Sequence, residues 1–552
     1  MALQTMISKT WKQLQGLRGS PLTRGRKAAE AGKLTKAAGI WQEGARAGDG
    51  ECQFALAEAL AKGIGVLRDP GGAFRWYLAA AESGLALAQT RVASLYARGI
   101  GHAGEGEGRA GGDAPFFLAQ DDKAARHWAR LAAEQGNVEA QVLLGWLLSR
   151  DGGPGVPREP EDAARWYGRA ADAGNATGMV GLANLISAGE VPGREPAEAY
   201  PLYRRAADQD NATAAYFTGT HLLNGIGTDA DPVEARRWLS KASEAGIIAA
   251  MRLLGLLYLR GTVGRADPVQ AETWIRRAAV KGDADSMVLL AELHQQGRTT
   301  VPNRSEAVVW YTAAAEAGNA RAALALGQIH LRGDGVIPDA ARGLRYLEQA
   351  AAELPEAEFQ LGMCFLEGMG VPEDHDRARQ HIMKAAGQRH ADATYNLGVM
   401  HYHGKGVPLD KEAAFRCYAA AAELGSASAQ FRLAYAMTLG VEIPEDPERA
   451  ITLFTLSAQQ GHVVSQVNLA RMLLKHRPDA EAELADVRRR METAAAQEFP
   501  AVLAVLGEMA WRLDQDRETA MALVARAEAL GDPHAAYVRE MVTAAAGPLP
   551  AA

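Results

Sequence analysis

The sequence has little of what disulfide-rich, secreted or membrane-spanning proteins contain. Only three cysteines occur in 552 residues, Cys52, Cys364 and Cys417. An odd number of widely separated cysteines argues against a disulfide framework and favours a reducing compartment. No apolar run approaches the roughly 20 residues that a membrane span requires. The N-terminus has no apolar core followed by a small-residue cleavage site, so we expect no secretory signal.

Charge and catalytic motifs are equally sparse. A net charge of -7 over this length provides no broad basic surface, so nucleic acid is not expected as a partner. The patterns H-E-x-x-H, C-x-x-C and G-x-S-x-G do not occur. His294, His330 and His401 occupy equivalent positions, where a metal ladder is the alternative to simple packing; we expect packing. The sequence therefore predicts a protein that is not an enzyme and has no catalytic residue, cofactor or metal.

What the sequence does contain is a repeat. The stretch 303–333 encodes two amphipathic helices joined by a tight turn, and it recurs with a period of about 36 residues. We call the residue in that turn the anchor. The anchors are Gly48, Gly84, Gly136, Gly174, Asp210, Gly246, Gly282, Gly318, Glu353, Arg389, Gly425, Gly461, Glu498 and Gly531. A period held this closely is typical of stacked helical hairpins.

Each position of the repeat has a physical role. Four and nine residues after the anchor the side chain is small, which lets paired helices approach closely. Eight residues before the anchor many repeats carry Trp, for which we expect packing between hairpins. Segments such as Gly333-Asp334-Gly335-Val336 predict helix C-caps, and pairs such as Asp231-Pro232 predict helix starts.

The rhythm of the repeat also suggests the boundaries of the chain's parts. Residues 1–28 form a basic amphipathic segment, and residues 29–542 form the repeat array. A Gly-rich insertion covers about 99–115. Repeats decay over 472–542, and a disordered tail is expected over 543–552.

The pattern A-x-x-x-L-G-x-x-Y-x-x-G-x-G-V-x-x-D-x-x-x-A-x-x-W-Y-x-x-A-A-E-x-G resembles the Sel-1-like repeat family, relatives of the tetratricopeptide repeats. Segments 250–282 and 393–425 carry nearly the whole motif. The resemblance implies an all-α, right-handed superhelical solenoid of about 13 helix-turn-helix repeats. It further implies a bacterial adaptor, typically without catalysis, that serves signalling, cell-envelope or exopolysaccharide assembly, or host interaction. The absence of paired cysteines in each repeat favours a cytoplasmic location.

Two surfaces are candidates for partner binding. In related superhelices the A-x-x-x-L-G helix lines the inner wall, and later repeats place aromatic and polar residues there. We predict a peptide-binding wall, with solvent-facing polar residues and packed aromatics as the alternative. The wall comprises Phe359, Gln360, Tyr395, Asn396, Phe431, Arg432 and Asn468. A ladder of Arg98, Arg150, Arg260 and Arg332 either attracts an acidic partner or complements helix C-termini, which we favour.

The other candidate surface is the N-terminus. Six basic residues precede the first acid, Glu30, and apolar residues recur at helical spacing. Residues 1–20 either dock on an anionic membrane or a partner, or only cap the solenoid. The docking residues would be Met6, Ile7, Lys9, Trp11, Lys12 and Leu14. The alternative function is accordingly a membrane-associated assembly or regulatory factor for envelope or exopolysaccharide machinery, peripheral to the inner membrane.

Overall fold

The computed structural model describes residues 19–100, 116–153, 155–298, 301, 303–495 and 497–546. Within these residues the regular structure consists of 29 α-helices and one short 3-10 helix, and no strand forms. A single isolated bridge pairs Ile100 with Leu118. The predicted all-α solenoid fold is confirmed. The chain forms two compact units, 1–281 and 282–552, which are described separately.

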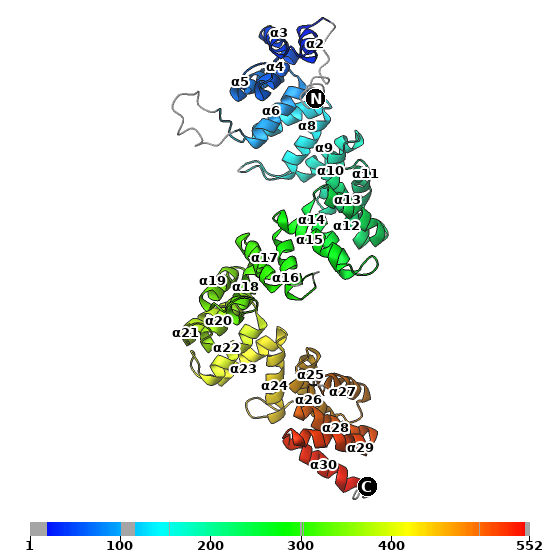
Figure 1. Ribbon diagram of the computed structural model, residues 1–552, viewed down its shortest axis with the longest axis vertical. Coiled ribbons are helices and arrows are strands. Elements are labelled where there is room, and N and C mark those ends of the chain that lie inside the picture. Colours follow the sequence, from blue (N-terminus) through cyan, green and yellow to red (C-terminus); the bar gives the residue numbers. More distant parts are fainter. Residues whose placement is uncertain are drawn as a thin grey trace. The chain divides into compact units, whose positions relative to one another are not determined.

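Helices of the N-terminal unit run in hairpins along the chain (Figure 1). They are α2 (Pro21–Glu30), α3 (Leu34–Arg46), α4 (Gly50–Lys62), α5 (Pro70–Glu82), α6 (Ala86–Arg98), α7 (Asp122–Glu134), α8 (Val138–Ser149), α9 (Pro160–Asp172), α10 (Ala176–Ser187), η1 (Pro196–Glu198), α11 (Ala199–Ala207), α12 (Ala212–Asn224), α13 (Pro232–Glu244), α14 (Ile248–Arg260) and α15 (Pro268–Val280).

Helices of the C-terminal unit continue the same pattern. They are α16 (Ala284–Gln295), α17 (Arg304–Glu316), α18 (Ala320–Arg332), α19 (Ala340–Ala351), α20 (Pro355–Glu367), α21 (His375–Gly387), α22 (Ala391–His403), α23 (Lys411–Glu423), α24 (Ala427–Leu439), α25 (Pro447–Gln459), α26 (Val463–His476), α27 (Glu481–Ala495), α28 (Pro500–Asp514), α29 (Arg517–Ala529) and α30 (Pro533–Ala546).

From α4 onward, even-numbered helices follow an anchor and odd-numbered helices precede one. Within each unit a helix packs on its neighbours in the chain, and even-numbered helices of successive hairpins also touch, as α6 and α8 do. In each unit the even-numbered helices thus form one layer and present a common face. Their ends match the predicted caps: Gly333 ends α18 in the left-handed conformation, and the Asp231 side chain accepts from the backbone at the start of α13.

The anchor turn requires a positive φ. Gly246 has φ 99°, and a Cβ there would meet nothing within 4 Å, so backbone conformation alone favours glycine at this position. Three anchors without glycine keep the same conformation, with φ 60° at Asp210, 63° at Arg389 and 55° at Glu498. Glu353 is not among the residues with positive φ; the next helix begins two residues later at Pro355. The turn is therefore retained in three of these four repeats.

Close approach of the paired helices explains the small residue nine positions after the anchor. A Cβ on Gly255 would lie 2.5 Å from Ile275, and one on Gly362 would lie 2.6 Å from Ile382. The residue that opposes each glycine, Ile275 or Ile382, comes directly after the repeat position that many repeats fill with Trp. Trp238 and Trp274 are buried, while Trp76, Trp128, Trp166 and Trp310 are only half-buried. The residue after the Trp is more deeply buried than the Trp itself, since Leu239 and Ile275 are fully buried.

A buried glutamine five residues after the anchor is a device that the sequence analysis missed. Gln89 Nε2 donates to the carbonyl of Ala81, 3.1 Å away, which also accepts from Gly84 N in the anchor turn at 3.0 Å. Gln53, Gln141, Gln430 and Gln466 make the same bond to a carbonyl eight residues earlier. The side chain thereby adds a second bond to a carbonyl at the end of the preceding helix, and its own buried amide nitrogen gains a partner in an apolar layer.

The first and last described helices, α2 and α30, extend into the segments predicted to flank the repeat array. Helix α2 starts at Pro21, within the predicted segment 1–28, and buries Leu22 against the first hairpin. Residues 1–18 and 101–115 lie outside the described residues, as do 547–552 of the predicted tail. Helix α30 continues to Ala546. Among the described helices, none has both the length and the apolar character needed to cross a membrane.

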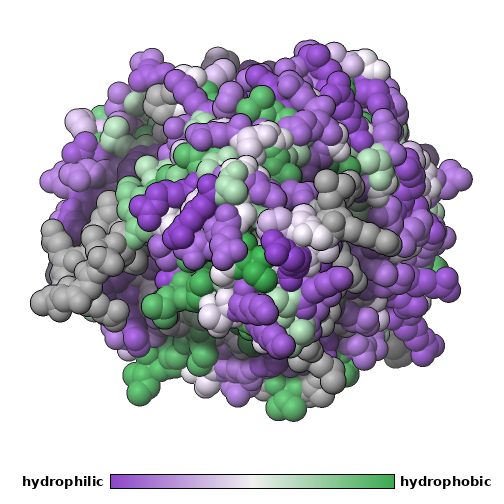
Figure 2. Space-filling model, turned by 90° about the horizontal axis from the view of Figure 1, so that it is seen from above, coloured by the Kyte–Doolittle hydropathy of each residue, from purple (hydrophilic) through white to green (hydrophobic). Residues whose placement is uncertain are grey.

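Exposed apolar side chains are scattered. Several lie in the turns after even-numbered helices, including Leu67, Ile337 and Val441, which are 91%, 87% and 75% exposed. Figure 2 shows a mostly hydrophilic face on which hydrophobic residues form small separate groups. Apolar exposure on this face is thus divided rather than gathered into one broad patch.

Candidate partner-binding grooves

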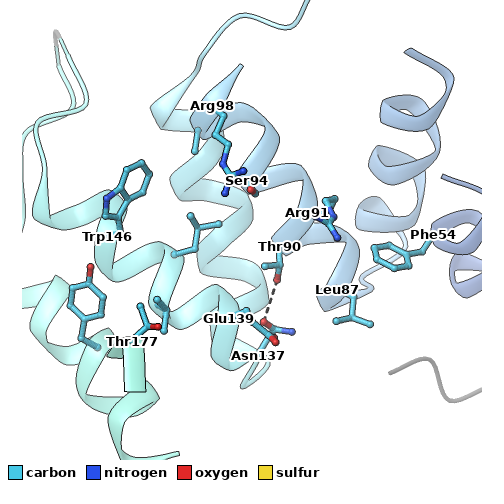
Figure 3. A pocket seen from close by; sticks show the side chains of 14 residues that line it. Phe54, Leu87, Thr90, Arg91, Ser94, Arg98, Asn137, Glu139, Trp146 and Thr177 are labelled. Atoms are coloured by element: carbon cyan, nitrogen blue, oxygen red, sulfur yellow. Dashed lines mark hydrogen bonds between the residues drawn. The ribbon is translucent and has the colours of Figure 1, made fainter. Parts of the chain in front are cut away.

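The larger groove lies in the N-terminal unit, on the common face of α6 and α8. It encloses 590 Å³, and residues from α4, α9 and α10 complete its lining. Its apolar part includes Leu87, Val142, Leu143 and Trp146 (Figure 3). Thr90, Ser94 and Asn137 add polar groups, so the groove offers both apolar contact and hydrogen bonding.

The repeat itself creates this lining. Residues at three, six, seven and ten positions after the anchor share one helix face, and α6 and α8 contribute such residues side by side. Asn137 caps α8 by accepting from Ala140 N at 2.9 Å, and its Oδ1 also accepts from Thr90 Oγ1 at 3.3 Å. This second bond, drawn in Figure 3, joins the two helices below the groove.

Trp146 is held in place by neighbouring charges. The Arg150 guanidinium carbon lies 3.9 Å from the centroid of its ring, and Arg150 Nη2 is 2.8 Å from Asp122 Oδ1. Asp122 is almost fully buried. The indole therefore has a fixed position although it is 42% exposed, which lowers the entropy lost when a ligand packs against it.

Arg91 stands at the α4 side of the groove and belongs to a buried network. Its Nη2 lies 3.1 Å from Glu58 Oε1, which also accepts from Tyr77 OH at 2.6 Å, and Lys62 pairs with the same carboxylate. Burial alone would raise the pKa of Glu58, but Arg91 and the bonds from Lys62 and Tyr77 outweigh it and hold the pKa below its ordinary value. The charge of Arg91 is thus used inside the protein.

Arg98 and Glu139 differ from Arg91. Both line the groove, and within the part of the chain that the structure describes neither side chain makes an ion pair or hydrogen bond. Arg98 is the last residue of α6 and Glu139 lies in the first turn of α8, so they mark opposite ends of the groove.

The predicted wall lies in the C-terminal unit, and its aromatic residues are half-buried. Phe359 stacks on His390 with ring centroids 5.1 Å apart, Tyr395 contacts Tyr418 at 5.5 Å, and Phe431 contacts His462 at 5.0 Å. Tyr418 belongs to α23, and His390 and His462 are the N-caps of α22 and α26. Their ring contacts are therefore at least partly between elements of the solenoid.

The polar residues of the predicted wall make mostly local bonds. Asn396 Nδ2 donates to Asp392 O and Asn468 Nδ2 to Val464 O, both at 2.8 Å and within one helix. Gln360 Nε2 donates to Glu356 Oε1 at 2.7 Å. These bonds use the amide nitrogens of Asn396 and Asn468, so that the amide oxygens remain acceptors for other donors.

Of the seven predicted wall residues, Arg432 alone lines the second, smaller groove among the described residues. This groove encloses 200 Å³ and includes Tyr402, Phe415 and Tyr435. The Arg432 guanidinium carbon lies 4.8 Å from the Tyr402 ring centroid, and Tyr402 OH donates to Glu442 at 3.0 Å. Sequence reasoning missed these aromatic residues because it followed two positions of the repeat, whereas the groove collects residues from α22, α23 and α24.

The larger groove was missed for a related reason. Arg98 was recognised in the arginine ladder, but nothing in the spacing indicated that it lies in one hollow with Leu143. The volume is decided by side-chain sizes in two adjacent helices. The sequence feature that could have indicated the groove is the set of small residues, such as Ala97 and Ser94, that line it together with Trp146.

The histidines pack against other side chains. His294 and His330 are 2% and 5% exposed, and His330 stacks on Tyr346 with centroids 5.7 Å apart. Burial lowers the pKa of His330, and Arg342 adds to this effect. Over the described ranges no three His, Cys, Asp or Glu residues are placed to hold a metal ion. The predicted docking residues Met6, Ile7, Lys9, Trp11, Lys12 and Leu14 lie outside the described residues.

Comparison with known proteins gives a sequence relative that matches over a short stretch, and several similar structures. Chitin synthase regulatory factor 3 of Schizosaccharomyces pombe is 29% identical over 136 residues, which is 24% of this chain and 13% of that protein. A protective antigen of uropathogenic Escherichia coli with an SLR fold has a TM-score of 0.55 at 24% identity, covering 87% of this chain and 98% of the antigen. A Sel1 repeat protein from Oxalobacter formigenes is 30% identical, covering 56% of this chain and 89% of its own, with a TM-score of 0.47.

The Sel1 repeat matches this chain eleven times, over most of its length. The matched residues are 50–85, 111–137, 138–175, 176–211, 212–247, 248–283, 284–319, 320–353, 355–390, 391–426 and 427–462. Apart from the start at 111, their boundaries fall within two residues of the anchors, and each match beyond the insertion contains one helix hairpin or its equivalent. Hairpin stacking, the anchor turns and the matched repeats agree, and the chain belongs to the Sel1 repeat family.

Proposed function

We propose that this protein is a non-enzymatic scaffold that binds a segment of a partner protein in the groove of α6 and α8. Sel1 repeat proteins generally mediate protein–protein interaction, and their solenoid is typically a non-catalytic scaffold. The observation that carries the proposal is the 590 Å³ groove, which combines a fixed tryptophan with polar groups on a preformed helical face. A preformed surface needs little ordering when a flexible segment binds.

A regulatory role suits this scaffold best. The curated relative is named a regulatory factor, although the match covers only 13% of its length. A scaffold of this kind acts by holding one protein near another rather than by chemistry. We place it in the cytoplasm, which agrees with free thiols at Cys52, Cys364 and Cys417.

The proposal is tested by selecting phage-displayed random dodecapeptides on the full-length protein and then measuring their binding to groove-filling variants. Ser94→Trp and Leu143→Arg both fill the hollow, and Ser94 makes no side-chain hydrogen bond within the described part of the chain. Selected peptides are expected to bind both variants at least about tenfold more weakly.

Leu253→Arg is the matched control, because Leu253 holds the same position of the repeat on α14, outside the groove. Circular dichroism and thermal unfolding verify that each variant folds. Peptides that bind the filled variants as well as the unaltered protein would contradict the groove as the recognition site.

A further inference from the structure

We infer that the groove of α6 and α8 selects an extended segment with an acidic side chain held by Arg98 and an adjacent apolar side chain packed against Trp146. This inference rests on the proposed function and adds the chemistry of the partner. Arg98 and Glu139 line the groove without an ion pair or hydrogen bond to any other described residue, so both charges are free to meet a ligand.

Arg91 and Arg98 line the groove, and Arg150 lies over its Trp146; two of these three arginines have internal partners. Arg91 pairs with Glu58, and Arg150 pairs with Asp122 while covering Trp146. Arg98 has neither an ion pair nor a hydrogen bond within the described residues, and its side chain folds back along α6 toward Ser94 (Figure 3). A guanidinium at the rim of an apolar hollow is matched by a carboxylate, which it binds with two parallel hydrogen bonds.

Arg98 also ends a helix, and a cation there interacts favourably with the last carbonyl groups. That effect applies equally to Arg260 at the end of α14 and Arg332 at the end of α18. Neither Arg260 nor Arg332 lines the larger or the smaller groove. A substitution of Arg260 therefore tests the helix-end role apart from ligand binding, because Arg260 also ends a helix but does not line either groove.

The apolar neighbour follows from the other side of the groove. Trp146 and Leu143 come from α8 and face the hollow opposite Ser94 and Arg98 of α6. An acidic residue alone would leave this surface wet, and an apolar residue alone would leave Arg98 without a partner. A segment that carries both next to each other satisfies the two sides together.

Glu139 sets the length and direction of the occupant. It lies three residues after its anchor, whereas Arg98 lies fourteen after its own, so the two ends of the groove are about 16 Å apart at 1.5 Å per helical residue. An extended segment spans that distance with about five residues. Because the Arg98 side chain folds back toward Ser94 (Figure 3), a basic residue at most about five positions from the acidic one would meet Glu139, and this order of charges orients the segment.

The test uses the same dodecapeptide selection on the full-length protein, followed by synthetic peptides made from the selected sequences. Enrichment of Asp or Glu next to an aromatic or aliphatic residue is expected. Replacing that acid with its amide should weaken binding at least about tenfold, since a hydrogen bond to a charged group is lost. Arg98→Met should cause the same loss and remove the difference between the acidic and amide peptides.

Arg260→Met should leave binding within about twofold of the unaltered protein, because this change alters a helix end but not the groove. Peptides that lose binding in the Ser94→Trp variant yet show no acid preference, or bind Arg98→Met normally, would overturn the inference and leave the scaffold proposal standing. A failure to select any peptide whose binding depends on Ser94 and Leu143 would overturn both.

Discussion

The side chain of Ile275 fills the space that a Cβ on Gly255 would need, with a separation of only 2.5 Å from Cγ1. Replacing Gly255 with Ala gains helix propensity of about 1 kcal/mol but overpacks the contact between α14 and α15. We expect a net destabilisation of about 1–2 kcal/mol, measured by urea unfolding followed by circular dichroism. Gly168→Ala is the control: nothing lies within 4 Å of its added Cβ, so stabilisation is expected. A stabilising Gly255→Ala would contradict the close packing.

Arg389 holds a left-handed turn that its own side chain disfavours, with φ 63°. Arg389→Gly should stabilise the C-terminal unit by about 0.5–1 kcal/mol, because relief of the strained φ exceeds the extra freedom that glycine gives the unfolded chain. Glu353→Gly, at the anchor without a positive φ, should destabilise by a similar amount. Thermal unfolding should show a higher melting temperature for Arg389→Gly and a lower one for Glu353→Gly. Equal shifts of the melting temperature would contradict the explanation by backbone strain at Arg389.

His462 makes stability depend on pH. Its Nδ1 accepts from Ser465 N at 3.2 Å, so the ring caps α26 in the neutral form, and burial lowers its pKa below 6.5. The unfolded chain therefore binds a proton more readily than the folded one, and this contribution is complete above about pH 6.5 and decreases as the pH falls toward the folded pKa. Acidification should lower the free energy of unfolding.

His462→Asn keeps a good capping oxygen without a titrating ring. The variant should resemble the unaltered protein at neutral pH and lose less stability in acid, as measured by unfolding at a series of pH values. His127→Asn, which changes an exposed residue of α7, serves as the control. An identical loss in the His462 variant would show that other groups dominate the acid response.

Asn396 and Arg432 test the predicted wall of the C-terminal unit. Both are half-buried, Asn396 bonds within its own helix, and Arg432 lies over Tyr402. Replacing both with Ala should reduce recovery of a partner in quantitative affinity purification from the native host, with little change in thermal stability. Asn224→Ala combined with Arg260→Ala gives a matched control in the N-terminal unit, because Asn224 makes the same bond to the carbonyl four residues earlier. Undiminished recovery would remove this wall from the binding surface.

Membrane docking by residues 1–20 stays a prediction, and the position of α2 shows which deletion should be used to test it. Because Leu22 is buried in the first hairpin, deletion of residues 1–18 is preferable to deletion of 1–28, which would cut into α2. The full chain should float with vesicles containing phosphatidylserine, and the shortened chain should not. Vesicles of phosphatidylcholine alone provide the control, and equal flotation of both chains would exclude docking by this segment.

Sequence by itself determined the helical hairpins, their period and their turns. Helix caps and anchors depend on backbone conformation, and residues such as Gly333 and Asp231 specify that conformation locally. Even so, the pattern did not predict that Arg389 would keep the left-handed turn, since a non-glycine residue adopts it only when the packed helices on both sides require it.

Tertiary structure alone decided where the solenoid is hollow. Arg98 and Trp146 are 48 positions apart in the chain, and only the packing of α6 beside α8 brings them to one groove. The predicted aromatics Phe359, Tyr395 and Phe431 hold equivalent repeat positions, yet each ring contacts a residue that belongs to a later helix or caps one. A period identifies which face a residue occupies, because that is a property of one helix. Whether a face is filled or open depends on side-chain volumes contributed by neighbouring helices, which no single repeat encodes.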